Sequence, residues 1–210
     1  MSEKITVHPY TIDDFNELLT IQKEAFPPPF PEELWWSKEH ITAHSETFPR
    51  GAMLARFDGQ PAGSATSLIT RYDGSLHTWE EVADNGFIKN THDPGGDTLY
   101  GIDVCVRPAF RGKGVAKALY EARKQLVQEL ELSRYIAGCR IPGFHKYADQ
   151  MSPVEYVNKV TSGELTDLVL SFMLTQGLSP LQVMPGYVED HESLNYAVIV
   201  EWQNPSITQV

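Results

Sequence analysis

The stretch that decides the fold is "VRPAFRGKGVAKALYEA", residues 106–122. An apolar run typical of a β-strand stops at Pro108, and two glycines, Gly112 and Gly114, come directly before a helical pattern. The first turn of a helix leaves N–H groups without partners and carries partial positive charge, so it binds anions well. Glycine lets the backbone approach such an anion closely and adopt conformations barred to other residues. The stretch therefore predicts a phosphate-binding turn between a strand and a helix.

Three kinds of phosphate loop compete for this pattern. A P-loop needs Gly-Lys followed by Ser or Thr to bind magnesium, whereas Lys113 is followed by Gly114. A Rossmann fingerprint needs a third glycine where this chain has Lys117. The pattern that remains is Arg-Gly-x-Gly-x-Ala after a strand ending in Val-x-Pro. We expect one oxyanion group to be held by the residues Arg111, Gly112, Lys113, Gly114, Val115 and Ala116.

Composition and charge narrow the class of protein. The 210 residues, 41% hydrophobic and 21% charged, suit one large α/β domain with a substantial core or, less easily, two small domains. A net charge of −11 repels nucleic acid and anionic membranes, which argues against both partners, and it weakly favours an amine substrate. The first residues, "MSEKITVHPY", lack the apolar core of a signal peptide, and no apolar stretch approaches a membrane span, so we expect a cytoplasmic protein. Cys105 and Cys139 have no partner at metal or redox spacing and are expected to be buried free thiols.

Hydrophobic periodicity and turn signals predict alternating strands and helices. An Asp-Gly pair predicts a hairpin turn at residues 58–59. The polar, glycine-rich residues 71–97 show no sustained period and are expected to be a long loop. Strands are expected at residues 5–10, 51–57, 61–70, 98–106, 134–139 and 193–202, and helices at residues 11–26, 32–44, 115–130, 152–160 and 168–177. This order predicts an α/β (α+β) fold with one mixed central β-sheet and helices on both faces.

The sequence "VRPAFRGKGVAKAL" resembles the acetyl-CoA-binding motif of the GNAT N-acetyltransferases, whose loop cradles the pyrophosphate of coenzyme A. The resemblance extends from residue 5 to about residue 203 and implies a single GNAT-type domain over residues 1–210, with insertions near 71–97 and 141–165. The stretches "HDPGGDTLYGIDVCVRP" and "AGCRIPGFHKYADQMSPVEYV" resemble, more narrowly, the acetyltransferase-type module found fused ahead of nitrilase-like carbon–nitrogen hydrolases. The implied activity is direct transfer of an acetyl group from acetyl-CoA to an amine.

Such a transfer needs a neutral amine, a donor to the developing oxyanion and a group that protonates the departing thiolate. In the family, the strand before the loop splays from its neighbour and binds pantetheine through free backbone groups. By position these groups belong to Val104, Cys105 and Val106, and one N–H there would be the oxyanion donor. The resemblance implies a catalytic base at Asp103, which strand alternation places opposite Val104, although a carboxylate that only stabilises the fold is the alternative. Tyr100 is the second catalytic candidate on this strand.

The general acid is where the chain departs from the family. The family usually places a tyrosine four residues before a glycine in the last helix; here the glycine is Gly177 and Met173 holds the position. Tyr147, in the segment after "CRIPG", is the expected replacement, with Tyr156 and His145 as alternatives. The methionine also supports a different interpretation, in which the chain is a non-catalytic CoA-binding sensor or a partner module of an amidase or nitrilase-type enzyme.

The identity of the acceptor stays open at this stage. We expect a small-molecule or peptide amine, bound near Trp35, residues 71–97 and the segment from Pro142. The sequence does not fix the oligomeric state, and a homodimer is one alternative. No metal is expected, because the histidines and aspartates that gather in one loop lack ligand spacing: His77, His92, Asp93 and Asp97.

Overall fold

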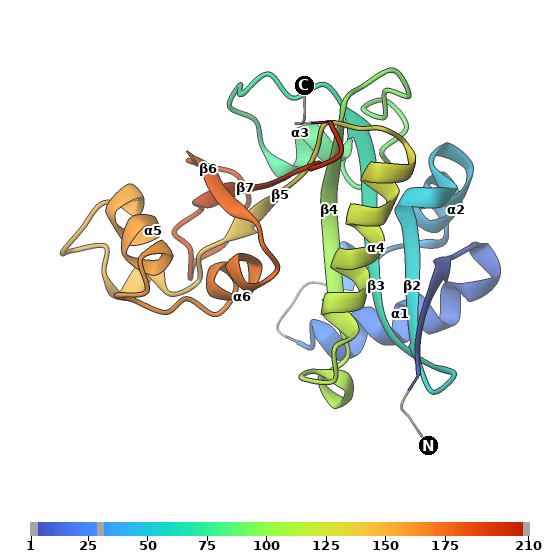
Figure 1. Cartoon of the computed structure of the whole chain (residues 1–210). Helices are drawn as coiled ribbons and strands as arrows, with labels where there is room; N and C mark the ends of the chain where they lie inside the picture. The colour runs from blue at the N-terminus through green and yellow to red at the C-terminus, as the bar shows by residue number, and fades with distance from the viewer. Residues whose placement is uncertain (1–3, 29–31, 208–210) are drawn as a thin grey trace.

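A seven-stranded sheet forms the centre of the protein (Figure 1). The computed structural model describes residues 4–28 and 32–207. The strand order is β1-β2-β3-β4-β5-β7-β6, and every neighbouring pair is antiparallel except β4 and β5, which are parallel. The strands are β1 (Ile5–Pro9), β2 (Ala52–Phe57), β3 (Gln60–Thr70), β4 (Thr98–Val106), β5 (Arg134–Arg140), β6 (Ser179–Met184) and β7 (Ala197–Gln203).

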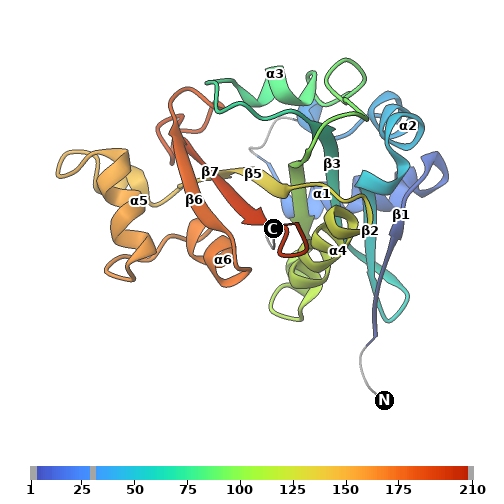
Figure 2. The ribbon, with the colours of Figure 1, turned by 45° about the horizontal axis from the view of Figure 1, so that its top comes forward.

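Helices cover both faces of this sheet. The helices are α1 (Phe15–Ala25), α2 (Lys38–Thr47), α3 (Trp79–Ala83), α4 (Val115–Glu129), α5 (Pro153–Thr161) and α6 (Leu170–Thr175). Helix α4 lies across one face and contacts the strands from β1 to β5, whereas α1 packs on β3 and β4 from the other face (Figure 1). Helices α5 and α6 lie beside the β5–β7–β6 part of the sheet (Figure 2). The expected fold class, a mixed sheet with helices on both faces, is confirmed.

Local sequence signals placed several elements correctly. Ser152 accepts a hydrogen bond from the backbone N–H of Glu155, whose carboxylate accepts from the Ser152 N–H, and this capping box begins α5. Asp58 and Gly59 have φ angles of 47° and 80°, as the two-residue hairpin turn between β2 and β3 requires. The pattern of the sequence is therefore sufficient to predict these boundaries.

One strand and one helix lie where the sequence predicts neither. Strand β6 is a short strand at the sheet edge, and it contains Pro180, a residue that argues against a strand except at an edge. Within the expected loop 71–97, helix α3 starts at a capping box formed by Thr78 and Glu81. The Thr-x-x-Glu spacing was the available signal for this helix.

The second helix also begins later than expected. Residues 32–44, expected to be one helix, form a short 3-10 turn and then α2. Ser37 starts the new helix, because its hydroxyl accepts a hydrogen bond from the backbone N–H of His40 at 3.3 Å.

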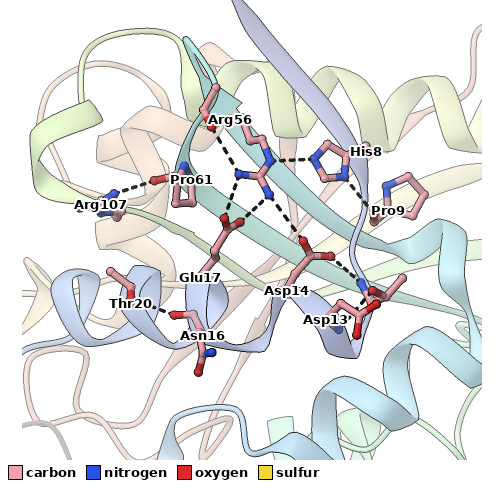
Figure 3. Close-up of polar contacts among 12 residues, drawn as sticks. His8, Pro9, Asp13, Asp14, Asn16, Glu17, Thr20, Arg56, Pro61 and Arg107 are labelled. Carbon is pink, nitrogen blue, oxygen red and sulfur yellow. Dashed lines mark hydrogen bonds and ion pairs between the residues drawn. The ribbon is translucent and has the colours of Figure 1, made fainter.

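Arg56 on β2 fastens α1 to the edge of the sheet (Figure 3). Its guanidinium donates to the carboxylates of Glu17 on α1 and Asp14 just before it, and its Nε donates to His8 on β1 at 3.2 Å. These side chains are partly exposed, so each ion pair contributes about 1 kcal/mol or less. The cluster orients α1 on the face opposite α4.

Two kinds of site are not found in the described part of the chain. Over residues 4–28 and 32–207, no helix combines the length and the apolar character that crossing a membrane requires. The same residues include no group of three His, Cys, Asp or Glu side chains placed to hold a metal ion. His92, for example, accepts the Ile69 N–H at 3.1 Å and stacks on Phe48.

The feature that positions the site is the early separation of β4 from β5. These strands pair only from Thr98 with Arg134 to Gly101 with Ala137. Beyond that point β4 continues to pair with β3, and β5 continues to pair with β7. The second half of β4 therefore has an open edge on the side of β5.

Candidate active site

The glycine turn before α4 has the conformation and exposure of an anion site. Gly112 and Gly114 have φ angles of 75° and 87°, in the region that favours glycine. Both are exposed, and a Cβ added to Gly112 would meet no atom within 4 Å. Gly114 is the N-cap of α4 and no side chain caps this helix, so N–H groups of the first turn, including those of Val115 and half-buried Ala116, remain available.

The cations around this turn have different partners. Arg111 is exposed and its Nε donates to the carbonyl of Val106 at 3.3 Å. The ammonium of Lys113, also exposed, lies 4.9 Å from the centre of the Phe57 ring. Both side chains can turn toward an anion at the loop, because no carboxylate among the described residues forms an ion pair with either.

Arg107, the first cation of the stretch, is already engaged. Its guanidinium donates to both carboxylate oxygens of Glu24 on α1, at 2.9 and 2.8 Å. It also donates to the carbonyl of Pro61 at 2.8 Å (Figure 3). This side chain therefore ties the end of β4 to α1 and is not available to a ligand.

Two valines present backbone groups at the open edge of β4. The backbone N–H of Arg107 donates to the carbonyl of Ala62 on the β3 side. Because backbone hydrogen bonds alternate along an antiparallel strand, the backbone groups of Cys105 and Asp103 also point toward β3. The N–H and C=O groups of Val104 and Val106 point the other way, toward the part of β5 that has diverged. Val106 and Val115 both lie 3.1 Å from the position of a Cβ on Gly63, so this face of the strand is the one that α4 covers.

Cys105 lies between these valines but faces away from the open edge. It pairs with Ser64 of β3, and its Sγ lies 3.4 Å from the Ser64 hydroxyl on the face opposite α4. Burial raises the pKa of the thiol, which keeps it protonated. Of the three residues expected to bind pantetheine, Val104 and Val106 therefore have backbone groups at the open edge, and Cys105 does not.

Asp103 lies on the same face as Cys105. Its register partner is Thr66, whose hydroxyl lies 2.8 Å from the Tyr10 hydroxyl on the side of the sheet that α1 covers. Burial raises the pKa of the Asp103 carboxyl to about 6, against the opposing effects of Arg123 and Trp36. Its Oδ2 atom is buried and has no hydrogen-bond partner in the described part of the chain.

Two stacked tryptophans border this face of the open edge. Trp36 and Trp79 have ring centres 6.1 Å apart, and the Trp79 indole donates to the Ile102 carbonyl at 2.9 Å. Trp35, the residue expected near the acceptor, instead donates to the carbonyl of Phe26 at 3.3 Å. Trp36 is therefore the indole that packs with Trp79 beside the open edge of β4.

Tyr100 belongs to a line of hydrogen bonds beside the point where β4 and β5 part. Its hydroxyl lies 2.9 Å from His77 Nε2 and 2.9 Å from the hydroxyl of Tyr187, which comes from the loop between β6 and β7. In the sequence, His77 belongs only to a group of loop residues that lacks metal-ligand spacing, and no local pattern singles out Tyr187. Their proximity comes from residues far apart in the chain.

The residues considered for the general acid lie in two places. Tyr147 packs against Tyr156 of α5, with ring centres 5.6 Å apart, and no hydrogen bond in the described structure joins it to β4. Met173 on α6 is buried, and its sulfur accepts a hydrogen bond from the hydroxyl of Tyr120 on α4 at 2.9 Å. The structure thus places the hydroxyl of Tyr120, which the sequence did not single out, against Met173.

Comparison with known proteins agrees with this geometry. Residues 15–146 match the model of the Acetyltransferase (GNAT) family. The chain belongs to this family. It is 45% identical over 204 residues to the "Uncharacterized N-acetyltransferase YkwB" of Bacillus subtilis (strain 168), which covers 96% of this chain and 90% of that protein. GNAT membership and this relative identify the chain as an acyltransferase that moves an acetyl group from acetyl-CoA to an amine.

A second relative and two solved structures are also similar to this chain. The chain is 39% identical over 205 residues to the "Probable hydrolase YhcX" of the same organism, and it spans only 39% of that protein. The loading GNATL domain of CurA from Lyngbya majuscula superposes with a TM-score of 0.80 at 19% identity, over 96% of this chain and 98% of that one. The GphF GNAT-like decarboxylase, in complex with isobutyryl-CoA, gives a TM-score of 0.70 at 19% identity, over 95% and 99%. At these identities the two structures establish the fold alone.

Proposed function

We propose that acetyl-CoA binds on the α4 face of the sheet and that the amine reaches the thioester from the opposite face, through the opening between β4 and β5. The observation that carries this proposal is the open edge of β4, which lies directly before an uncapped helix N-terminus. The helix N-terminus suits the pyrophosphate, and Gly112 and Gly114 leave room for it. Val104 and Val106 would then bond the amide groups of the pantetheine arm.

The oxyanion and the base would lie on either side of β4. The Val104 N–H at the open edge is our proposed donor to the oxyanion that forms when the amine attacks, because a fixed backbone dipole needs no reorganisation. Asp103, on the other side, is our proposed base. A carboxyl with a pKa near 6 is mostly ionised at neutral pH and is a stronger base than an ordinary aspartate.

For the proton that the departing thiolate takes up, we propose Tyr120 in preference to Tyr147. Its hydroxyl lies between α4 and α6, on the sheet face where the thioester would lie. Tyr120 also follows Ala116 by one helical turn, so both side chains line the same stripe of α4. A thioether is a weak acceptor, so the hydroxyl can exchange Met173 for a thiolate. Burial raises the pKa of Tyr120 and keeps the proton available.

The acceptor that we propose is a small-molecule or peptide amine with an apolar part next to nitrogen. Trp36 and Trp79 provide an aromatic surface beside the open edge. The net charge of −11 attracts a cationic amine to the protein.

The test is release of free CoA thiol from acetyl-CoA across a panel of primary amines, with the acetylated product identified by mass spectrometry. Transfer to at least one amine, lowered in Asp103→Asn and Tyr120→Phe, supports the proposal. A CoA-binding sensor would bind acetyl-CoA tightly and release no thiol above background with any amine.

The same assay with a carboxyacyl-CoA thioester distinguishes acetyl transfer from decarboxylation. A decarboxylase would release carbon dioxide from that thioester without any amine. Decarboxylation is the alternative because the GphF GNAT-like decarboxylase has the same fold. Carbon dioxide release without amine acetylation would replace the proposed function.

A further inference from the structure

Acetylation of an amine that arrives protonated releases a proton that the products do not keep. An ammonium ion and acetyl-CoA give an amide, CoA thiol and one proton in excess. The proposed base, Asp103, is half-buried, and only its Oδ2 atom is buried without a hydrogen-bond partner in the described part of the chain. In the proposed function this carboxylate takes up the proton that the nitrogen loses as the amide forms, so it does not account for the excess proton of the ammonium ion. The excess proton therefore needs a separate route out of the site at every turnover.

We propose that Tyr187, Tyr100 and His77 form a proton relay that carries this excess proton from the transfer site to solvent. The inference rests on the proposed function, since it assigns the route by which an ammonium acceptor becomes a neutral nucleophile. The three side chains are joined by two hydrogen bonds of 2.9 Å each. Both tyrosines are buried, at 0% and 2% exposure for Tyr100 and Tyr187, whereas His77 is half-buried.

The inner end of the relay lies where the open edge begins. A Cβ added to Gly138 would lie 2.2 Å from the Tyr187 hydroxyl, so this hydroxyl rests directly on the backbone of β5. Gly138 is the first residue of β5 beyond the last pair with β4. The Tyr187 carbonyl accepts the N–H of Trp79 at 2.7 Å, and the Trp79 indole bonds to Ile102 at the open edge. Tyr187 is thus held beside the opening through which the amine would enter.

The outer end reaches a surface pocket. His77 and Tyr100 line a cavity of about 310 Å³ together with Tyr72, Asp73, Glu81 and others. A histidine at this position can exchange a proton with solvent, which the two buried tyrosines cannot do.

The hydrogen bonds have one consistent direction. His77 Nδ1 lies 3.0 Å from the carbonyl of Ser75, and a carbonyl only accepts, so Nδ1 carries the ring proton. In the neutral ring Nε2 is then an acceptor and receives the Tyr100 O–H. The oxygen of Tyr100 is left to accept the Tyr187 O–H. Every donor therefore points from the open edge toward the pocket.

The transfer step follows from this direction. The ammonium N–H gives its proton to the Tyr187 oxygen as Tyr187 passes its own proton to Tyr100 and Tyr100 passes its own to His77 Nε2. The N–H electron pair stays on the acceptor nitrogen, which becomes the neutral nucleophile, and His77 becomes an imidazolium. His77 then loses a ring proton to solvent, and the hydroxyls turn back to reset the relay. Burial raises the pKa of both tyrosines, so neither remains ionised during the transfer.

Charged and titratable groups surround His77. Its ring lies 6.0 Å from that of Tyr72, centre to centre. Asp73, Glu81 and Arg71 also line the pocket, and the Arg71 guanidinium donates to Asp93 and to the Gly95 carbonyl. Toward the inner end, Glu80 acts on Tyr187 and helps to keep it protonated. The pocket lining thus includes two acidic residues and one basic residue.

The experiment compares an acceptor that arrives protonated with one that does not. 2-Phenylethylamine is cationic at neutral pH, and O-benzylhydroxylamine has nearly the same shape and is neutral. His77→Gln keeps an acceptor for Tyr100 but cannot take up a proton, and Tyr100→Phe breaks the line. We expect each variant to lower kcat for 2-phenylethylamine at least tenfold at pH 7 and to change kcat for O-benzylhydroxylamine less than twofold. The deficit should shrink as pH rises, because bulk water then supplies the neutral amine.

Tyr72→Phe is the matched control, because Tyr72 shares the pocket and touches His77 while its hydroxyl bonds to Gln182 at 3.1 Å. It should leave both acceptors unaffected. An equal loss with both acceptors in His77→Gln would show a structural role and overturn the relay. If the wild-type protein acetylates neither of these two acceptors, the comparison is made with a cationic amine that it does acetylate and a neutral acceptor of matching shape, whereas failure with the whole panel contradicts the proposed function. Nitrogen NMR of His77 tests the direction of the relay independently of turnover. A proton on Nδ1 supports the relay, and a proton on Nε2 overturns it.

Discussion

Replacement of Gly112 by glutamate tests the anion site with a magnitude that the structure supplies. The glycine has a φ angle of 75° and open space around it, so a glutamate fits sterically in the free protein at a backbone cost of about 1–2 kcal/mol. Its carboxylate would face the pyrophosphate. Two unit charges about 4 Å apart at an effective dielectric of about 20 repel by roughly 4 kcal/mol. The Kd for CoA should therefore rise about a thousandfold.

The matched control is Gly163→Glu. Gly163, which follows α5, is also exposed, has a φ angle of 82° and has no atom within 4 Å of an added Cβ. Both variants should lose similar stability by thermal melting, and only Gly112→Glu should lose CoA binding by calorimetry, with part of the loss recovered at high salt. A folded Gly112→Glu protein with wild-type affinity for CoA would refute the placement of the pyrophosphate.

Three further predictions follow from side chains that the structure places. The fold raises the pKa of Asp103 from 3.8 to about 6, so the folded state favours the protonated carboxyl. The stabilisation of the fold by this protonated carboxyl is fully present below pH 3.8 and is lost as the pH rises through about 6. Asp103→Asn should therefore raise the free energy of unfolding by about 3 kcal/mol at pH 8 and by little at pH 3, while kcat falls and its rise near pH 6 disappears. Arg107→Gln removes the ion pair with Glu24 and should cost about 1 kcal/mol by urea unfolding, with the Kd for CoA changed less than threefold. Burial raises the pKa of both Cys105 and Cys139, so iodoacetamide should modify neither in the native protein at pH 8 and both in denaturant, as mass spectrometry would show.

The part of the site that sequence alone predicts is the part built from neighbours in the chain. The strand, the turn with Gly112 and Gly114, and the helix are contiguous, so each carries its own signal in periodicity and backbone preference. Asp103 and the two valines are in the same stretch, and strand alternation correctly separates their faces.

The remaining parts depend on contacts across long separations. Tyr187 meets Tyr100 over 87 residues, and His77 meets Tyr100 over 23, so no local pattern marks the line that they form. The choice between Trp35 and Trp36 depends on which indole faces α3, which only the packing decides. The ion pair between Arg107 and Glu24 could not be predicted from the sequence either, because the two residues are 83 positions apart in the chain.

The short contact between β4 and β5 has a mechanical consequence. Four residue pairs join these strands, whereas eight join β3 to β4 and seven join β5 to β7. The sheet thus consists of two parts, β1 to β4 and β5 to β7, joined only by the short pairing of β4 with β5. The pantetheine arm carries two amide groups, so beyond Gly101 the cofactor would take the place of a neighbouring strand and form hydrogen bonds with the open edge of β4. A ligand bound between the two parts of the sheet would connect them, and the two parts would then unfold as one cooperative unit.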